Sequence, residues 1–192
     1  MELLLAVGIG IGLSSIAGVR AFLPLVLVGL FAQLGLFTLP APFGFLDDWA
    51  VIGVFAGLAL LESGLDKIPS LDPVLDYAQT PLRIIAGAIL FAAALQEGID
   101  VGALPELAVG GVIAGLVAVL KVILRPAANA ASAGVSASFL SLVEDAVALL
   151  GGIIAVLVPL VPLALVAFLL FFFFRVRRRR GRKYGGLRIL GD

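Results

Sequence analysis

The chain has 192 residues, of which 62% are hydrophobic and 14% are charged, whereas soluble domains of this length carry about 25% charged residues. Together with a mean hydropathy of +1.22, this composition excludes an ordinary soluble domain and predicts one compact membrane bundle. The absence of cysteine and histidine excludes disulfides, thiolate metal sites and the usual near-neutral proton carrier. Any proton chemistry must therefore use carboxylates.

The apolar segments predict a series of membrane-spanning helices. A helix that crosses a bilayer core of about 30 Å needs roughly 17–25 apolar residues. In chain order, the candidate spans are 3–19, 21–39, 49–64, 81–96, 107–124, 138–158 and 160–175. The predicted fold is an all-α, polytopic transmembrane helix bundle of about six to seven spans, with one or two broken or re-entrant helical segments.

The first apolar run, from Leu3 to Ala17, is expected to be a retained membrane helix. A signal peptide would begin with a basic segment and end in a small-residue cleavage site, whereas this run follows Glu2 and precedes Arg20.

The distribution of charge predicts the orientation of the chain. Cytoplasmic loops carry an excess of Lys and Arg, and residues 175–188 are rich in basic side chains and contain no acidic ones. With that tail in the cytoplasm and seven crossings, the N-terminus lies on the outer side of the membrane. The protein is expected in the cell (inner or plasma) membrane. Every other basic residue then lies inside, and the outer loops hold acids: Asp47, Asp48, Glu97, Asp100 and Glu106.

Three regions follow from this threading. Residues 1–158 form the membrane bundle with its polar cluster, 159–175 the final span, and 176–192 a basic cytoplasmic tail that is expected to be disordered. Pro159 and Pro162 interrupt a run that is too long for one crossing. The tail would attract anionic lipid headgroups by about 1 kcal/mol per basic residue, and nucleic acid is not an expected partner.

The densest group of charges runs from residue 62 to 83. A charge in hydrocarbon costs roughly 2.5–3.5 kcal/mol, so such residues tend to be partnered and functional. Glu62 and Asp66 share one helical face and would repel each other unless a cation, a proton or a metal lies between them. Pro69 is expected to end that helix, residues 73–80 to form a short helix, and Pro81 to start the next span. The segment is either a lined polar cavity or an amphipathic cytoplasmic loop.

Two further segments carry charges that the predicted orientation places in the same cytoplasmic half of the bundle. Arg20 lies where helix continuity is doubtful, and it either binds an anion, pairs with Glu62 or Asp66, or snorkels to lipid headgroups. Lys121 and Arg125 precede a stretch of small residues, which is either a second re-entrant element or a flexible linker. The candidate substrate- or ion-binding residues are Glu62, Asp66, Arg20, Lys67, Asp76, Arg83, Lys121, Arg125, Asn129, Glu144 and Asp145.

Three sequence motifs carry a family resemblance. They are G-V-R-A-F-L-P at 18–24, E-x-x-x-D-K-I-P-x-x-D-x-x-x-D-x-x-Q-x-x-x-R at 62–83, and the later K-x-x-x-R and Asn129 followed by S-L-V-E-D. They resemble an uncharacterised prokaryotic membrane family, the domain of unknown function 4126. The resemblance covers about residues 5–152, with Ile84 where proline is expected, and residues from about 153 are expected to be an addition. It supports a site at these positions and names no substrate.

These observations favour a transporter or channel-like protein with a polar cavity open to the cytoplasm. Glu62 and Asp66 would bind a proton or a small ion or solute, with Arg20 and Arg125 as partners. The alternative is a membrane scaffold, or a lipid- or partner-binding protein, in which the charges are structural. No catalytic residue and no cofactor are predicted, because no Gly-x-Ser-x-Gly elbow appears. A carboxylate-bound metal stays open, and its identity is unknown. A homo-oligomer stays open as well.

Overall fold

The computed structural model describes all residues except 1, 37, 67–71, 97–102, 132–136 and 185–192. The described residues form helices and no strand, which confirms the all-α prediction. In chain order the elements are α1 (Glu2–Val19), α2 (Leu23–Gln33), the short 3₁₀ helix η1 (Phe43–Asp47), α3 (Trp49–Leu65), α4 (Asp72–Gln96), α5 (Ala103–Ala131), α6 (Ala137–Leu157) and α7 (Leu160–Tyr184).

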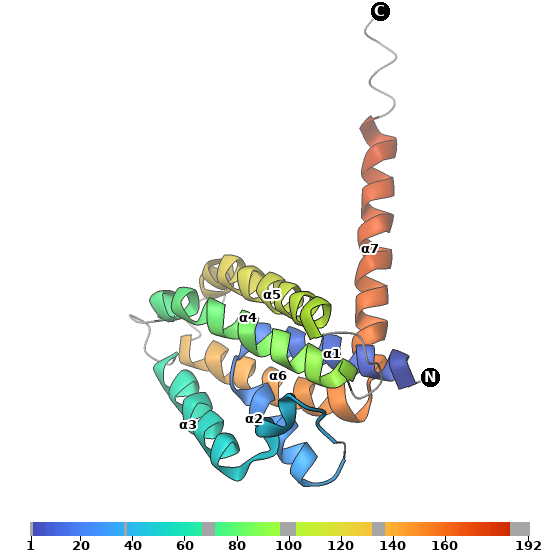
Figure 1. Ribbon diagram of the computed structural model, residues 1–192. Coiled ribbons are helices and arrows are strands. Elements are labelled where there is room, and N and C mark those ends of the chain that lie inside the picture. Colours follow the sequence, from blue (N-terminus) through green and yellow to red (C-terminus); the bar gives the residue numbers. More distant parts are fainter. Residues whose placement is uncertain (1, 37, 67–71, 97–102, 132–136, 185–192) are drawn as a thin grey trace, which may run out of the picture.

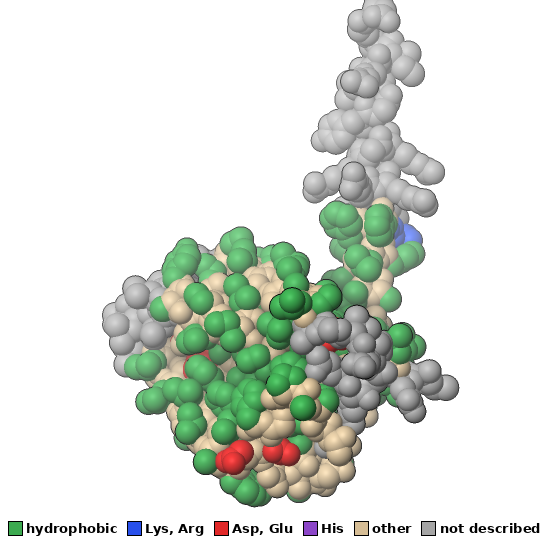
Figure 2. Space-filling view, in the orientation of Figure 1, with side chains coloured by type: hydrophobic (Ala, Val, Ile, Leu, Met, Phe, Trp, Pro, Cys, Tyr) green, Lys and Arg blue, Asp and Glu red, His purple; other side chains and the backbone are tan. Residues whose placement is uncertain are grey.

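Two of these helices are long and apolar enough to cross a membrane by length and composition alone. They are α4, over Asp76–Leu95, and α5, over Leu104–Leu124. The bent pair Ser141–Leu157 and Leu160–Arg175 would be a third span, and α1, α2 and α3 are shorter apolar helices. Large hydrophobic side chains are exposed over the bundle, and Figure 2 shows them covering much of the face in view. Such a surface is compatible with lipid rather than water.

Helix α1 lies at the centre and packs against α4, α5 and α6 (Figure 1). Glycines permit this close approach, because a methyl group at Gly18 would lie 2.6 Å from the carbonyl oxygen of Ala114. In the same way, a methyl group at Gly110 of α5 would lie 2.4 Å from the carbonyl oxygen of Gly87 in α4. The Ser14 hydroxyl donates to that same Gly87 oxygen over 2.8 Å, which ties α1 to α4 near the middle of the bundle.

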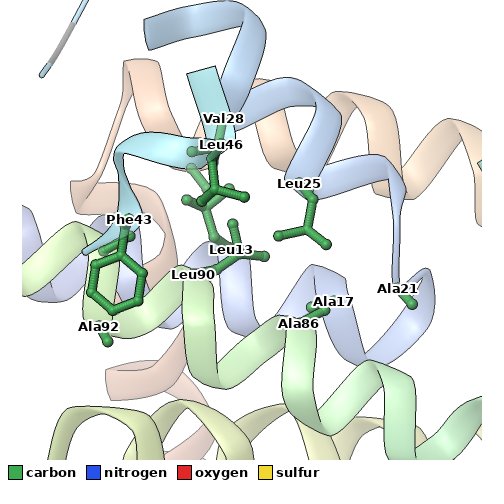
Figure 3. Packing of buried hydrophobic residues seen from close by; sticks show 12 residues of the cluster. Leu13, Ala17, Ala21, Leu25, Val28, Phe43, Leu46, Ala86, Leu90 and Ala92 are labelled. Carbon is green, nitrogen blue, oxygen red and sulfur yellow. The ribbon is translucent and has the colours of Figure 1, made fainter. Parts of the chain in front are cut away.

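The buried apolar core lies between α1, α2, α4 and η1 (Figure 3). Leu13 of α1, Val28 of α2 and Leu90 of α4 point toward one another, and Leu46 of η1 covers them. Each of these side chains is at most 2% exposed. Burial of such a side chain contributes about 1.5–3 kcal/mol in water, and in lipid tight packing takes over much of that role.

One predicted helix break is wrong. Residues 73–80 were expected to form a separate short helix, but α4 runs without interruption from Asp72 through Pro81 to Gln96. Pro81 removes a single backbone donor, the one that would bind the carbonyl oxygen of Tyr77. The loss of one bond is thus tolerated inside a long, well-packed helix.

The other predicted interruptions have mixed outcomes. The α1–α2 break around Arg20 is confirmed, since α1 ends at Val19 and α2 begins at Leu23. The break at Pro159 is also confirmed, with an angle of 108° between the two helices. Helix α5 continues through Pro126 to Ala131, so the irregular stretch expected from 126 does not begin there, and 132–136 lie outside the described residues.

Helix α7 stands away from the bundle beyond its first turns (Figure 1). Those first turns pack against α1, because a methyl group at Gly12 would lie 2.8 Å from Pro162 Cγ. The helix extends to Tyr184, whereas we expected a disordered tail from residue 176. Residues 185–192 lie outside the described residues.

Candidate functional site: a buried charge network

Five helix ends meet at one end of the bundle and carry charged side chains into it. Helices α1, α3 and α5 arrive there with their C-terminal ends, and α4 and α6 begin there. The charged residues form one set that we call the charge network: Arg20, Glu62, Asp66, Asp76, Arg83, Lys121, Glu144 and Asp145.

Arg20, at the α1–α2 break, joins α3 to α6. Its Nη1 forms an ion pair with the Asp66 carboxylate, and its Nε lies 2.9 Å from Asp145 Oδ1. Its Nη2 donates to the Ser141 hydroxyl over 2.9 Å and lies 3.8 Å from Glu144 Oε2. Arg20 is 1% exposed. Because the break ends α1 at Val19, the Arg20 side chain is free to extend across the bundle end.

Arg83, on α4, is the second buried cation of the network. Its Nη2 donates to Asp76 Oδ1 over 2.9 Å and to Gln79 Oε1 over 2.7 Å. The same nitrogen lies 3.9 Å from Glu62 Oε1. Gln79 lies four residues before Arg83, a spacing that places both side chains on one helical face.

Lys121 connects the Arg20 and Arg83 halves. Its Nζ lies 2.9 Å from Glu144 Oε2 and 3.2 Å from Asp76 Oδ1. It also donates to the carbonyl oxygen of Val19, the last residue of α1, over 3.3 Å. The ion pairs therefore run without interruption from Asp145 through Arg20, Glu144, Lys121, Asp76 and Arg83 to Glu62.

Among the described side chains, the network contains more carboxylates than cations. Three cations, Arg20, Arg83 and Lys121, face five carboxylates there. The side chains of two further cations of these segments, Lys67 and Arg125, lie outside the described residues. Arg83 and Asp66 are 0% exposed, whereas the side chains of Glu144 and Asp145 are 14% and 24% exposed. The network is thus buried at its centre and reaches the surface along α6.

The Glu62 carboxylate accepts backbone hydrogen bonds at the break between α1 and α2. The backbone N–H of Ala21 donates to Glu62 Oε1 over 3.2 Å, and that of Phe22 donates to Oε2 over 3.4 Å. No side-chain cap hydrogen bond comes from Phe22, the N-cap residue of α2. The Phe22 ring stacks on Phe55 of α3 with centroids 6.3 Å apart. A carboxylate from α3 therefore satisfies amides that a local cap would normally bind.

Several buried polar atoms at the centre of the network have no hydrogen-bond partner among the described residues. Among them are Nε and Nη1 of Arg83 and Oδ1 of Asp66. Buried polar groups are nearly always hydrogen-bonded, to protein or to ordered water, so these atoms require an explanation. No group of three or more Asp or Glu side chains suited to hold a metal ion occurs within the described ranges.

Eight of the predicted site residues lie in the charge network. They come from four separate segments of the chain. Lys67 lies outside the described residues, as do the side chains of Arg125 and Asn129 on α5. The sequence reasoning missed Gln79 and Ser141, which bind the two arginines, and Ser63, whose hydroxyl donates to Asp145 Oδ1 over 2.9 Å. The i,i+4 spacing of Gln79 and Arg83 was the available signal for one of them.

The comparison with known families adds one match. A model described as "Domain of unknown function (DUF4126)" matches residues 7–179. The match includes α6 and most of α7, which corrects the expectation that the shared region ends near 152. No curated protein and no solved structure was found to match the chain.

Proposed function

The chain belongs to the DUF4126 family, and we propose that it is a small integral membrane transporter or channel-like protein whose charge network exchanges protons or a small cation. The observation that carries the proposal is the unbroken series of ion pairs that runs from Glu62, which is buried, to Asp145, whose side chain is 24% exposed. Charged groups inside a membrane protein are costly and tend to mark ion or proton pathways. Carboxylates that share cations in this way offer successive positions for a proton or a small cation.

The access route runs along α6. Glu144 and Asp145 are the most exposed members of the network and contact Arg20, the cation between them and Asp66. Protons would enter at this edge and reach Asp66 and Glu62 through rearranged ion pairs. By the positive-inside rule the edge faces the cytoplasm. The α1–α2 break would then serve as the discontinuous helix that lines many transport sites.

A scaffold role is the second candidate, and a specific observation favours it. Each cation of the network has at least two carboxylates within ion-pair distance: Arg20 has Asp66, Glu144 and Asp145, Arg83 has Glu62 and Asp76, and Lys121 has Asp76 and Glu144. Such a network joins five helix ends and would hold the bundle together without binding any solute.

Proton flux in proteoliposomes tests the proposal. An imposed membrane potential should drive proton movement, read with a trapped pH-sensitive dye, in vesicles that contain the wild-type protein. Glu62→Gln and Asp66→Asn should abolish that flux while the melting temperature falls little. Asp47→Asn, outside the network, is the matched control and should keep the flux. Under the scaffold role, the wild type shows no flux above empty vesicles, and both network variants lose stability together.

The proposed orientation has its own test, because the chain has no cysteine that would interfere with labelling. Arg175→Cys on α7 should react with a membrane-impermeant thiol reagent only after the membrane is opened. Asp48→Cys, which precedes α3, should react in intact cells. The reverse pattern would contradict a cytoplasmic network and tail.

A further inference from the structure

The geometry points to a binding site for a small carboxylate ligand at the start of α2, where Glu62 now takes the place of the ligand. The site consists of the backbone N–H groups of Ala21 and Phe22 together with the Arg83 guanidinium. The inference rests on the proposed function, because a proton on Glu62 is what would open the site.

The shape of the site fits a carboxylate. Each oxygen of Glu62 accepts from a different amide, Oε1 from Ala21 over 3.2 Å and Oε2 from Phe22 over 3.4 Å. Adjacent N–H groups at the start of a helix favour an anion, because the free donors and the helix dipole both point at it. A planar carboxylate of another molecule would meet the same two donors.

Arg83 supplies an independent observation that points to a missing acceptor. Its side chain is 0% exposed, yet its Nε and Nη1 have no hydrogen-bond partner among the described residues. Its Nη2 approaches Glu62 Oε1 to 3.9 Å, which is beyond hydrogen-bond distance. The guanidinium therefore forms an ion pair with the carboxylate that occupies the site but no hydrogen bond to it. A free carboxylate, unlike one tethered to α3, can move to meet these donors, and such charge-assisted bonds are strong.

Glu62 is held by an element that can release it. Helix α3 buries Ile52 and Glu62 among its residues and leaves most of its surface exposed. A proton on Glu62 would remove the negative charge that holds it at the start of α2. When the ligand carboxylate then takes the two amides, one proton and one carboxylate have entered together. The formal charge of the network is unchanged, so the exchange adds no unbalanced charge to a buried place.

Acetate binding by the wild type and Glu62→Gln tests the site. Gln mimics a protonated glutamate, so the variant should bind sodium acetate at about pH 7 roughly tenfold more tightly than the wild type, measured by isothermal titration calorimetry. The wild type should gain affinity when the pH falls to about 5, and the variant should not. Asp47→Asn is the matched control and should behave as the wild type does. Arg83→Gln added to Glu62→Gln should remove the gain.

Three outcomes would overturn the inference. They are an unchanged acetate affinity in Glu62→Gln, a gain that survives the added Arg83→Gln change, and an equal gain for chloride or phosphate. If the Arg83 variant does not fold, the comparison of Glu62→Gln with the wild type still decides. Proton flux measured on the same preparation separates the two proposals. Flux that depends on Glu62, without any gain in acetate affinity, refutes the ligand and leaves the proposed function. The gain in affinity without flux refutes proton transport and leaves the binding site.

Discussion

Helices α3 and α4 both carry buried charged residues of the network but are attached to the bundle in different ways. Helix α4 packs along its length against α1 and α5 and buries Ala86, Leu90 and Ala92. Helix α3 buries little besides Ile52 and Glu62, and its C-terminal end is held by contacts of Glu62 and Asp66 with residues 20–22. Close packing makes α4 part of a rigid scaffold, whereas α3 depends on charged contacts, which protonation would loosen under the proposed function.

Of the changes proposed, Arg20→Met should lower the free energy of unfolding most. The change leaves Asp66 buried without its main partner, and breaking a buried pair in this way lowers the free energy of unfolding by about 3–5 kcal/mol. Thermal unfolding in detergent, followed by circular dichroism, should show a strongly lowered melting temperature. Arg175→Met, an exposed position on α7, should leave it unchanged. A small effect at Arg20 would show that α3 is held by packing after all.

Gly110→Ala should have the second-largest effect on the free energy of unfolding, because it adds a methyl group at the packed α4–α5 contact. The added methyl group would lie 2.4 Å from the carbonyl oxygen of Gly87 and 2.4 Å from Phe91 Cβ, so the helices must separate. Such overpacking costs about 1–3 kcal/mol in the free energy of unfolding. The neighbouring Gly111→Ala is a matched control, since its nearest contact is an ordinary 3.4 Å from Ile84. Equal melting temperatures for the two variants would contradict a tight α4–α5 interface.

Glu62→Gln should have a smaller and local effect. The amide keeps one acceptor for the two backbone N–H groups of Ala21 and Phe22, so the free energy of unfolding should fall by about 1 kcal/mol. Hydrogen exchange read by mass spectrometry should show faster exchange at residues 21–22 and along α3. Exchange in α4 and α5 should not change. Faster exchange throughout the bundle would mean that α3 is not a separate, looser unit.

Gly57→Ala should have the smallest effect, in the stabilising direction. Nothing lies within 4 Å of a methyl group at Gly57 on the exposed side of α3. Alanine favours the helix over glycine by up to about 1 kcal/mol. The melting temperature should therefore rise slightly, and Gly53→Ala, which is equally open, should do the same. A loss of stability at both positions would reveal a close neighbour on that face.

Much of the charge network could be predicted from the sequence, because helix direction and the positive-inside rule decide which loops share one side of the membrane. This reasoning places Arg20, Glu62 and Lys121 together from the sequence alone. The choice of partner could not be predicted. That Asp66 binds Arg20 while Glu62 binds the backbone depends on how far each helix is rotated, and a sequence pattern does not resolve that rotation.

The helix breaks show a similar limit. Pro159 was predicted to end a helix and does so, whereas Pro81 was predicted to do the same and lies inside α4. The residue type is the same, but helix α4 is packed along its length by α1 and α5. Tertiary packing therefore decides between a break and a tolerated proline, and local sequence does not contain that information.

The depth of the Arg20–Asp66 ion pair has a practical consequence for purification. Ions in solution screen exposed charges beyond about 8 Å at physiological ionic strength, but they act much less on a buried pair. Both side chains are at most 1% exposed. The protein should therefore tolerate concentrated salt during purification without a weakening of this pair, and its melting temperature should hardly depend on ionic strength.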